Sequence, residues 1–314
     1  FDKLNALAGY QLYSESRHDR SLHSGLLRNR TENLGVFSLN LDLGKTFTEN
    51  SGLFYGAEFL LNDVGSSANS LNLQQNTTEP IAPRYPNDSE YNSYAAYFSY
   101  KHNFSNKLIL QAGARYTNTC LSGEFDKAFY NFPFGGFDMS NAAFNGNFGA
   151  VWHPTPEWQV NLNASTGFRS PNIDDVAKVF DSEPGNVVVP NPDLEPEYAR
   201  NLELGLIRSY AGRARFEVTG FYTRLKNAMV RRDYFIDGQD SIVYDGVLSK
   251  VEALVNAESA SIYGGSVAFE YLFTPFLRTR NNLTIMKGED ADGLPLRHVP
   301  PTFGSSHLML ERQK

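Results

Sequence analysis

The chain lacks the features that mark disulfide-rich, nucleic-acid-binding and helical membrane proteins. Its 314 residues include a single cysteine, Cys120, which excludes an internal disulfide framework and a zinc site built from cysteines. The formal net charge is −7 and no lysine and arginine cluster forms a basic stripe, so no nucleic-acid partner is expected. No stretch approaches the roughly 18 consecutive apolar residues of a transmembrane helix.

Local motifs of common enzymes are also missing. There is no Gly-x-Ser-x-Gly elbow, His-Glu-x-x-His, P-loop or dinucleotide fingerprint. The six histidines are scattered and give no metal pair at helix or strand spacing. We therefore expect no catalytic residue, no metal site and no cofactor. A pair of facing carboxylates that cleaves carbohydrate stays open, because such a pair leaves no local motif.

What the sequence has in abundance is period-2 alternation, which is typical of strands with one apolar face. Leu202, Leu204 and Leu206 share one face of such a segment, while asparagine, serine, glycine and single charges occupy the opposite faces throughout. Aromatic residues make up 13% of the chain, and tyrosine and phenylalanine favour pleated surfaces. About twelve such segments and no convincing helical period predict an all-β protein.

The connections alternate between short and long. The short ones lie near residues 44–52, 103–107, 153–157, 209–213 and 273–276, and the long polar ones near residues 17–31, 63–91, 121–141, 169–197, 231–250 and 288–301. This order predicts an antiparallel up-and-down transmembrane β-barrel with a wet lumen. Aromatics near strand ends predict interfacial girdles: Tyr10, Tyr13, Tyr100, Phe104, Trp152, Trp158, Phe168, Tyr210, Phe273 and Phe276. Residues 243–273 are long for one strand, and Gly246 and the Gly264-Gly265 pair predict bulges or bends.

The long loop after Thr166 is framed by Pro171 and Pro192 and is the first candidate for a binding surface. Arg169 at its base could hold a carboxylate or a metal-chelate oxygen bidentately. The alternative for Arg169 is an ion pair with an acidic residue of the same loop or of the next strand: Asp174, Asp175 or Glu197.

Other loops supply further ligand-binding candidates. Arg231 and Arg232 could attract an anionic ferric chelate, although paired loop charges are usually solvated. Phe132, Phe134 and Tyr234 could stack on an aromatic siderophore, because exposed apolar patches tend to mark binding sites. Asn191 and Asp193 are the last two ligand-binding candidates. Their alternative role is to fix the angle at which the loop leaves the strand.

Two boxes around the long loop resemble the TonB-dependent outer-membrane receptors. They read Gly167-Phe168-Arg169-Ser170-Pro171 and Pro190-Asn191-Pro192-Asp193-Leu194-Glu195-Pro196-Glu197. Similar pieces follow in the family's order at residues 201–205, 220–227, 256–265, 292–297 and 299–301, so the resemblance covers roughly residues 152–310. The motif residues are Phe168, Arg169, Ser170, Pro171, Asn191, Pro192, Asp193 and Leu194.

The resemblance implies that residues 1–314 are one partial β-barrel domain, without the plug domain and the final barrel strands. Family barrels have 22 strands. It also implies TonB-energised import of a metal chelate such as a ferric siderophore, in the outer membrane of a Gram-negative bacterium. The partners are then the chelate, membrane lipid and, through the absent plug, the TonB complex.

Four other functions stay open. Heme and cobalamin receptors belong to the same family, and heme-type receptors carry a histidine between similar boxes, whereas residues 172–190 contain none. A soluble all-β ligand-binding module and a passive porin-like barrel would share the alternation.

Overall fold

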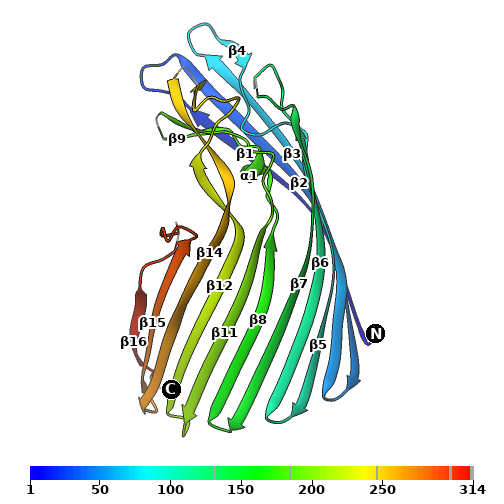
Figure 1. Ribbon diagram of the computed structural model, residues 1–314, viewed down its shortest axis with the longest axis vertical. Helices are drawn as coiled ribbons and strands as arrows, with labels where there is room; N and C mark the ends of the chain where they lie inside the picture. Colours follow the sequence, from blue (N-terminus) through cyan, green and yellow to red (C-terminus); the bar gives the residue numbers. More distant parts are fainter. Residues whose placement is uncertain (130–131, 184, 245–246, 297–298, 312–314) are drawn as a thin grey trace.

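The computed structural model describes residues 1–129, 132–183, 185–244, 247–296 and 299–311. Sixteen strands form one sheet, and a single four-residue helix, α1 (Ile173–Val176), is found in the described part. Figure 1 shows the sheet as a tall, curved, open wall. None of the described helical residues forms a helix long and apolar enough to cross a membrane.

Twelve long strands make the wall and follow one another in antiparallel order. They are β1 (Lys3–Asp19), β2 (Leu26–Thr48), β3 (Ser51–Asn72), β5 (Ser89–Ser105), β6 (Leu108–Glu124), β7 (Gly136–Thr155), β8 (Trp158–Arg169), β11 (Glu197–Tyr210), β12 (Ala214–Asp233), β14 (Val247–Thr274), β15 (Leu277–Asp290) and β16 (Phe303–Leu310). Four strands of three or four residues lie in the connections: β4 (Thr77–Pro80), β9 (Phe180–Glu183), β10 (Asn186–Val188) and β13 (Ser241–Tyr244). The predicted partial up-and-down barrel is confirmed, including its twelve long segments.

Short and long connections lie at opposite ends of the wall, as predicted (Figure 1). The connection predicted at residues 17–31 is much shorter in the structure than the sequence predicts. β1 runs to Asp19 and β2 begins at Leu26, with Arg17 paired to Arg30. The apolar face ends there, but the backbone ladder continues beyond it.

Of the bulge or bend predicted at Gly264 and Gly265, the bulge is wrong. Both residues pair in unbroken register with β12 and β15. A Cβ on Gly264 would lie 2.4 Å from the carbonyl oxygen of Ile285, so the glycine allows two backbones to approach closely. Gly246 lies outside the described residues.

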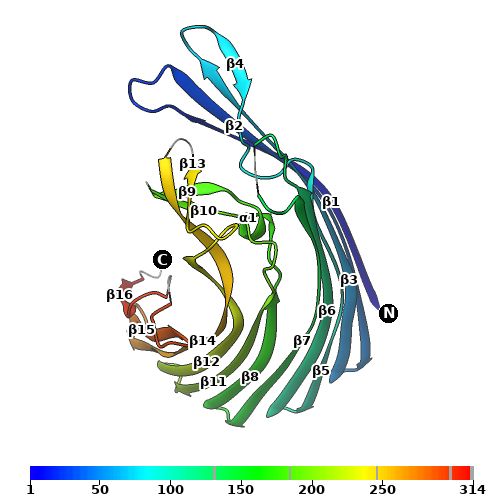
Figure 2. The ribbon, with the colours of Figure 1, turned by 45° about the horizontal axis from the view of Figure 1, so that its top comes forward.

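The wall has a concave face and a convex face (Figure 2). Val64 of β3 packs against the loop residues that fill the concave side, whereas Phe59 and Leu61, of opposite parity, are exposed. The leucines of β11 are exposed in the same way, with Leu204 57% exposed. The apolar face predicted for these strands is therefore the outer face of the wall, and the polar face lines the lumen.

Candidate functional site

The segment of residues 170–196 folds into the concave space instead of projecting outward (Figure 2). Asn172 begins α1: its side-chain oxygen accepts a hydrogen bond from the Asp175 amide at 3.0 Å, and the Asp175 carboxylate accepts one from the Asn172 amide at 3.1 Å. Downstream, β10 pairs in parallel with residues Lys250 to Glu252 of β14. A helix cap at one end and a strand pairing at the other hold the segment.

Side chains from several loops meet in one hydrophobic cluster, which we call the loop core. Its buried members are Leu121, Phe125, Phe137, Ile173, Val176, Ala177, Val179, Val187, Val189, Leu194, Ile236, Val251 and Ala253. They come from the long-loop end of the wall and from the 170–196 segment. Burial of this apolar surface makes the connections near residues 121–141, 170–196 and 231–250 one packed unit.

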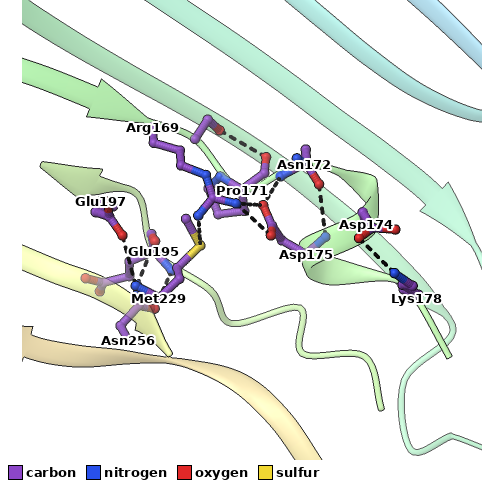
Figure 3. Close-up of polar contacts among 11 residues, drawn as sticks. Arg169, Pro171, Asn172, Asp174, Asp175, Lys178, Glu195, Glu197, Met229 and Asn256 are labelled. Carbon is purple, nitrogen blue, oxygen red and sulfur yellow. Dashed lines mark hydrogen bonds and ion pairs between the residues drawn. The ribbon is translucent and has the colours of Figure 1, made fainter. Parts of the chain in front are cut away.

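Arg169 ends β8 and pairs with Asp175, its Nη2 lying 2.7 and 2.8 Å from the two carboxylate oxygens (Figure 3). The guanidinium also contacts the Met229 sulfur at 3.7 Å. This is the ion-pair alternative for Arg169, while a role in ligand binding remains a prediction. Its neighbour Phe168 packs against Tyr198 with ring centroids 5.6 Å apart.

The second box is tied to the wall by Asn191, which is 6% exposed. Its amide nitrogen donates to the Leu254 carbonyl at 2.8 Å, and its amide oxygen accepts from the Asp193 backbone at 3.1 Å. Leu194 is buried in the loop core, while Asp193 is exposed. Asn191 and Leu194 thus fix the return of the segment, and Asp193 is the member of the box that solvent reaches.

The first box and Pro192 complete the motif. Ser170 is buried and accepts a hydrogen bond from the Asn141 side chain at 3.1 Å. Pro171 is fully buried, and Pro192 is partly exposed. These residues set the angle at which the segment leaves and rejoins the wall.

Arg231 and Arg232 both meet acidic residues. Arg231 lies 3.9 Å from Glu252, and Arg232 lies 3.0 Å from the carboxylate of Asp290, whose side chain is 8% exposed. Tyr234 packs against the loop core, and its burial, with the charge of Asp193, raises the pKa of its phenol. The two ion pairs join the long-loop ends of β12, β14 and β15 to one another.

Phe132 and Phe134 also pack inward. Their rings stack on each other at 5.4 Å, and each makes an edge contact with Phe125, at 5.4 and 5.6 Å. The two rings are half-buried against the loop core. Ligand stacking by these rings remains a prediction.

The structure reveals a cleft that the sequence did not predict. It lies between α1 and the concave faces of β1, β2, β3 and β5, and its volume is about 410 Å³. Tyr13, placed in a girdle by the sequence, lines this cleft, on the other face of β1 from Tyr10. The sequence signal that could have indicated this cleft is the alternation of Tyr13, Glu15 and Arg17, which places an aromatic and two charged side chains on one side of a strand.

Asp174 of α1 closes one side of the cleft through three contacts. The hydroxyl of Tyr85 and the ammonium of Lys178 donate to its carboxylate, the latter at 3.0 Å, and Arg84 lies 3.7 Å away. Burial raises the pKa of Asp174, but the two hydrogen bonds and the nearby cations outweigh burial and lower it. Burial, and then the bond to Asp174, raises the pKa of Tyr85.

No group of three or more histidine, cysteine, aspartate or glutamate side chains that could hold a metal ion occurs among the described residues. His298 falls outside those residues. The histidines at positions 18, 23, 102, 153 and 307 are absent from the lining of the cleft.

The model of the family described as "TonB dependent receptor-like, beta-barrel" matches residues 2–310. Among curated proteins, the hemoglobin-haptoglobin utilization protein B of Neisseria meningitidis serogroup C is 31% identical over 129 residues, which is 39% of this chain and 16% of that protein. The iron-regulated outer membrane virulence protein of Vibrio cholerae is 26% identical over 166 residues, 50% of this chain and 25% of that protein.

Solved structures share the fold. The copper transporter OprC superposes with a TM-score of 0.76 at 13% identity, covering 98% of this chain and 47% of its own. The ferric yersiniabactin uptake receptor FyuA of Yersinia pestis superposes with a TM-score of 0.66 at 17% identity, covering 97% of this chain and 44% of that receptor. The chain thus spans less than half of each of these proteins.

Proposed function

Because the chain belongs to the TonB-dependent receptor β-barrel family, we propose that it is part of an outer-membrane receptor that imports a metal chelate such as a ferric siderophore. The family is one of receptors and not of enzymes. The observation that carries the proposal is the family match across residues 2–310. The TonB complex, acting through a plug domain, is the proposed source of energy.

The long-loop end supports binding of a chelate there. The loop core holds the 170–196 segment inside the lumen, and a cleft of about 410 Å³ opens beside it. That volume is in the range of small-molecule sites, roughly 300–1,000 Å³. The lining combines tyrosines with charged side chains, which suits a polar ligand with aromatic or apolar parts.

Heme is the second candidate cargo. One observation favours it: the Neisseria relative is named for the utilization of hemoglobin and haptoglobin. Against it, residues 170–196 contain no histidine, and no histidine lines the cleft. Cobalamin is a further alternative cargo. A TonB-independent porin would instead pass small solutes without a bound chelate.

The test is growth of the host under iron limitation, with the gene present or deleted, on single sources: ferric siderophores, heme or hemoglobin. Cobalamin is tested in a strain that requires it. We expect the deletion to abolish growth on one ferric siderophore, and loss of TonB function to do the same. Growth loss only on heme or cobalamin would reassign the cargo. Small-solute uptake that persists without TonB would support the porin.

A further inference from the structure

Glu32 of β2 is the unusual residue of the cleft. Both of its carboxylate oxygens are shielded from solvent and neither has a hydrogen-bond partner among the described residues. The other acids of the lining are paired: Glu15 accepts from Arg17 at 2.6 Å and from Tyr13 at 3.2 Å. Asp174 has the partners described above. Among the three acids of this lining, Glu32 is the one whose carboxylate has no hydrogen-bond partner among the described residues.

A carboxylate that is buried without a partner raises the free energy of the folded protein, because it has lost its hydration and no hydrogen-bond donor takes the place of the water. Arg17 lies close enough to interact with the charge of Glu32, but its Nε is committed to Glu15. The charged side chains that line the cleft, three acids and two arginines, leave a formal charge of −1. The cleft therefore favours an occupant that brings a positive charge and N–H donors.

The tyrosine rings of the cleft indicate which kind of cation it would bind. Tyr13, Tyr85 and Tyr91 line the same cleft. Phenol rings attract organic cations through their faces, and a carboxylate among them is the complement of an ammonium group. Arg84 already occupies the face of Tyr85, 5.1 Å from the ring centroid. The Arg17 side chain is half exposed, so it can change rotamer when a ligand enters the cleft.

We propose that this cleft binds a primary ammonium group, with Glu32 as its counter-ion. The group is carried either by the imported chelate or by a free alkyl amine. The inference rests on the proposed function only for the statement that the bound molecule is imported; binding itself does not depend on transport.

The experiment measures binding by titration calorimetry with the intact receptor in detergent. One probe is a linear ferric trihydroxamate with a terminal ammonium group, and its partner is the same chelate N-acetylated at that amine. A third probe, 1,5-diaminopentane, tests a free amine. The variants are Glu32→Gln and, as a matched control, Glu79→Gln on the exposed strand β4. Thermal unfolding of each variant verifies that it is folded.

We expect the ammonium chelate, or the diamine if the source is a free amine, to bind to the intact receptor. The ammonium chelate should bind at least about tenfold more tightly than its acetylated form, and Glu32→Gln should remove that preference while Glu79→Gln keeps it. An equal affinity for both chelates together with no diamine binding would overturn the proposal. So would a preference that survives Glu32→Gln, because another acid of the cleft, Glu15 or Asp174, would then be the counter-ion. Ammonium binding without uptake would overturn only the transport proposal.

Discussion

The guanidinium of Arg169 lies 2.7 and 2.8 Å from the two carboxylate oxygens of Asp175, and this pair fixes the 170–196 segment where it leaves β8. Asp175 is 10% exposed, and its carboxylate also caps α1 through the Asn172 amide. One carboxylate therefore joins the strand end to the start of the helix.

Arg169→Lys should loosen that joint, because a single ammonium on a shorter side chain cannot reach both the Asp175 carboxylate and the Met229 sulfur, which Nη2 and Nη1 of the guanidinium contact separately. The Arg169 side chain is 47% exposed, so we expect a loss of only about 1 kcal/mol, or roughly fivefold faster amide exchange over α1. Hydrogen exchange of the intact receptor measures this, with Arg215→Lys at the opposite end as control. Unchanged exchange together with weaker chelate binding would assign Arg169 to the ligand instead.

Asn191→Asp should destabilise the loop core. The substitution places a carboxylate oxygen 2.8 Å from the Leu254 carbonyl, in place of a donor, at a position that is 6% exposed. A buried acceptor facing an acceptor costs about 1–3 kcal/mol, and more when it is charged. Limited proteolysis within residues 170–196 should accelerate. Asp193→Asn, two residues away and exposed, should leave the cleavage rate unchanged; equal rates in both variants would contradict the structural role of Asn191.

The sequence could predict the strands of the wall, but not the loop core and the cleft on its concave side. Alternation along β11 identifies its outer face, since strand parity is a local property, and the boxes identify the family. The partners of Asn191 and Arg232, by contrast, depend on how separate segments meet, since Leu254 and Asp290 lie far along the chain. Parallel pairing of β10 with β14 joins residues some 60 positions apart, as Asn186 and Lys250 show. No local pattern encodes such a contact. The same holds for the cleft, whose lining comes from four strands, α1 and the connection that carries Arg84 and Tyr85.

Acidification should release α1 from the connection that carries Arg84 and Tyr85, by protonating Asp174. The pKa of this carboxyl is lowered in the folded protein, so its contribution to stability is complete above the ordinary aspartate pKa of about 3.9. It is lost as the pH falls through the lower folded value. Pepsin cleavage of residues 170–196 between pH 5 and 2 should therefore rise steeply only below about pH 4. Asp174→Asn should cleave quickly across the whole range. Wild-type cleavage that rises already between pH 5 and 4, with Asp174→Asn following the same curve, would assign the transition to another group.

The pairing of β14 with β15 should depend on Gly264. A Cβ at this position would lie 2.4 Å from the Ile285 carbonyl oxygen and 2.9 Å from the Met286 Cα, both backbone atoms that cannot move without breaking the ladder. Gly220 pairs with Gly265 in the neighbouring ladder, and its added Cβ would lie 4.0 Å from the Gly264 carbonyl oxygen, an ordinary contact. We expect Gly264→Ala to cost about 1–3 kcal/mol or more and Gly220→Ala to be tolerated. Heat modifiability on gels, which separates folded from unfolded barrels, measures both in the intact receptor. Equal midpoints would show that β15 can shift to admit the methyl group, so that close approach is not what requires a glycine there.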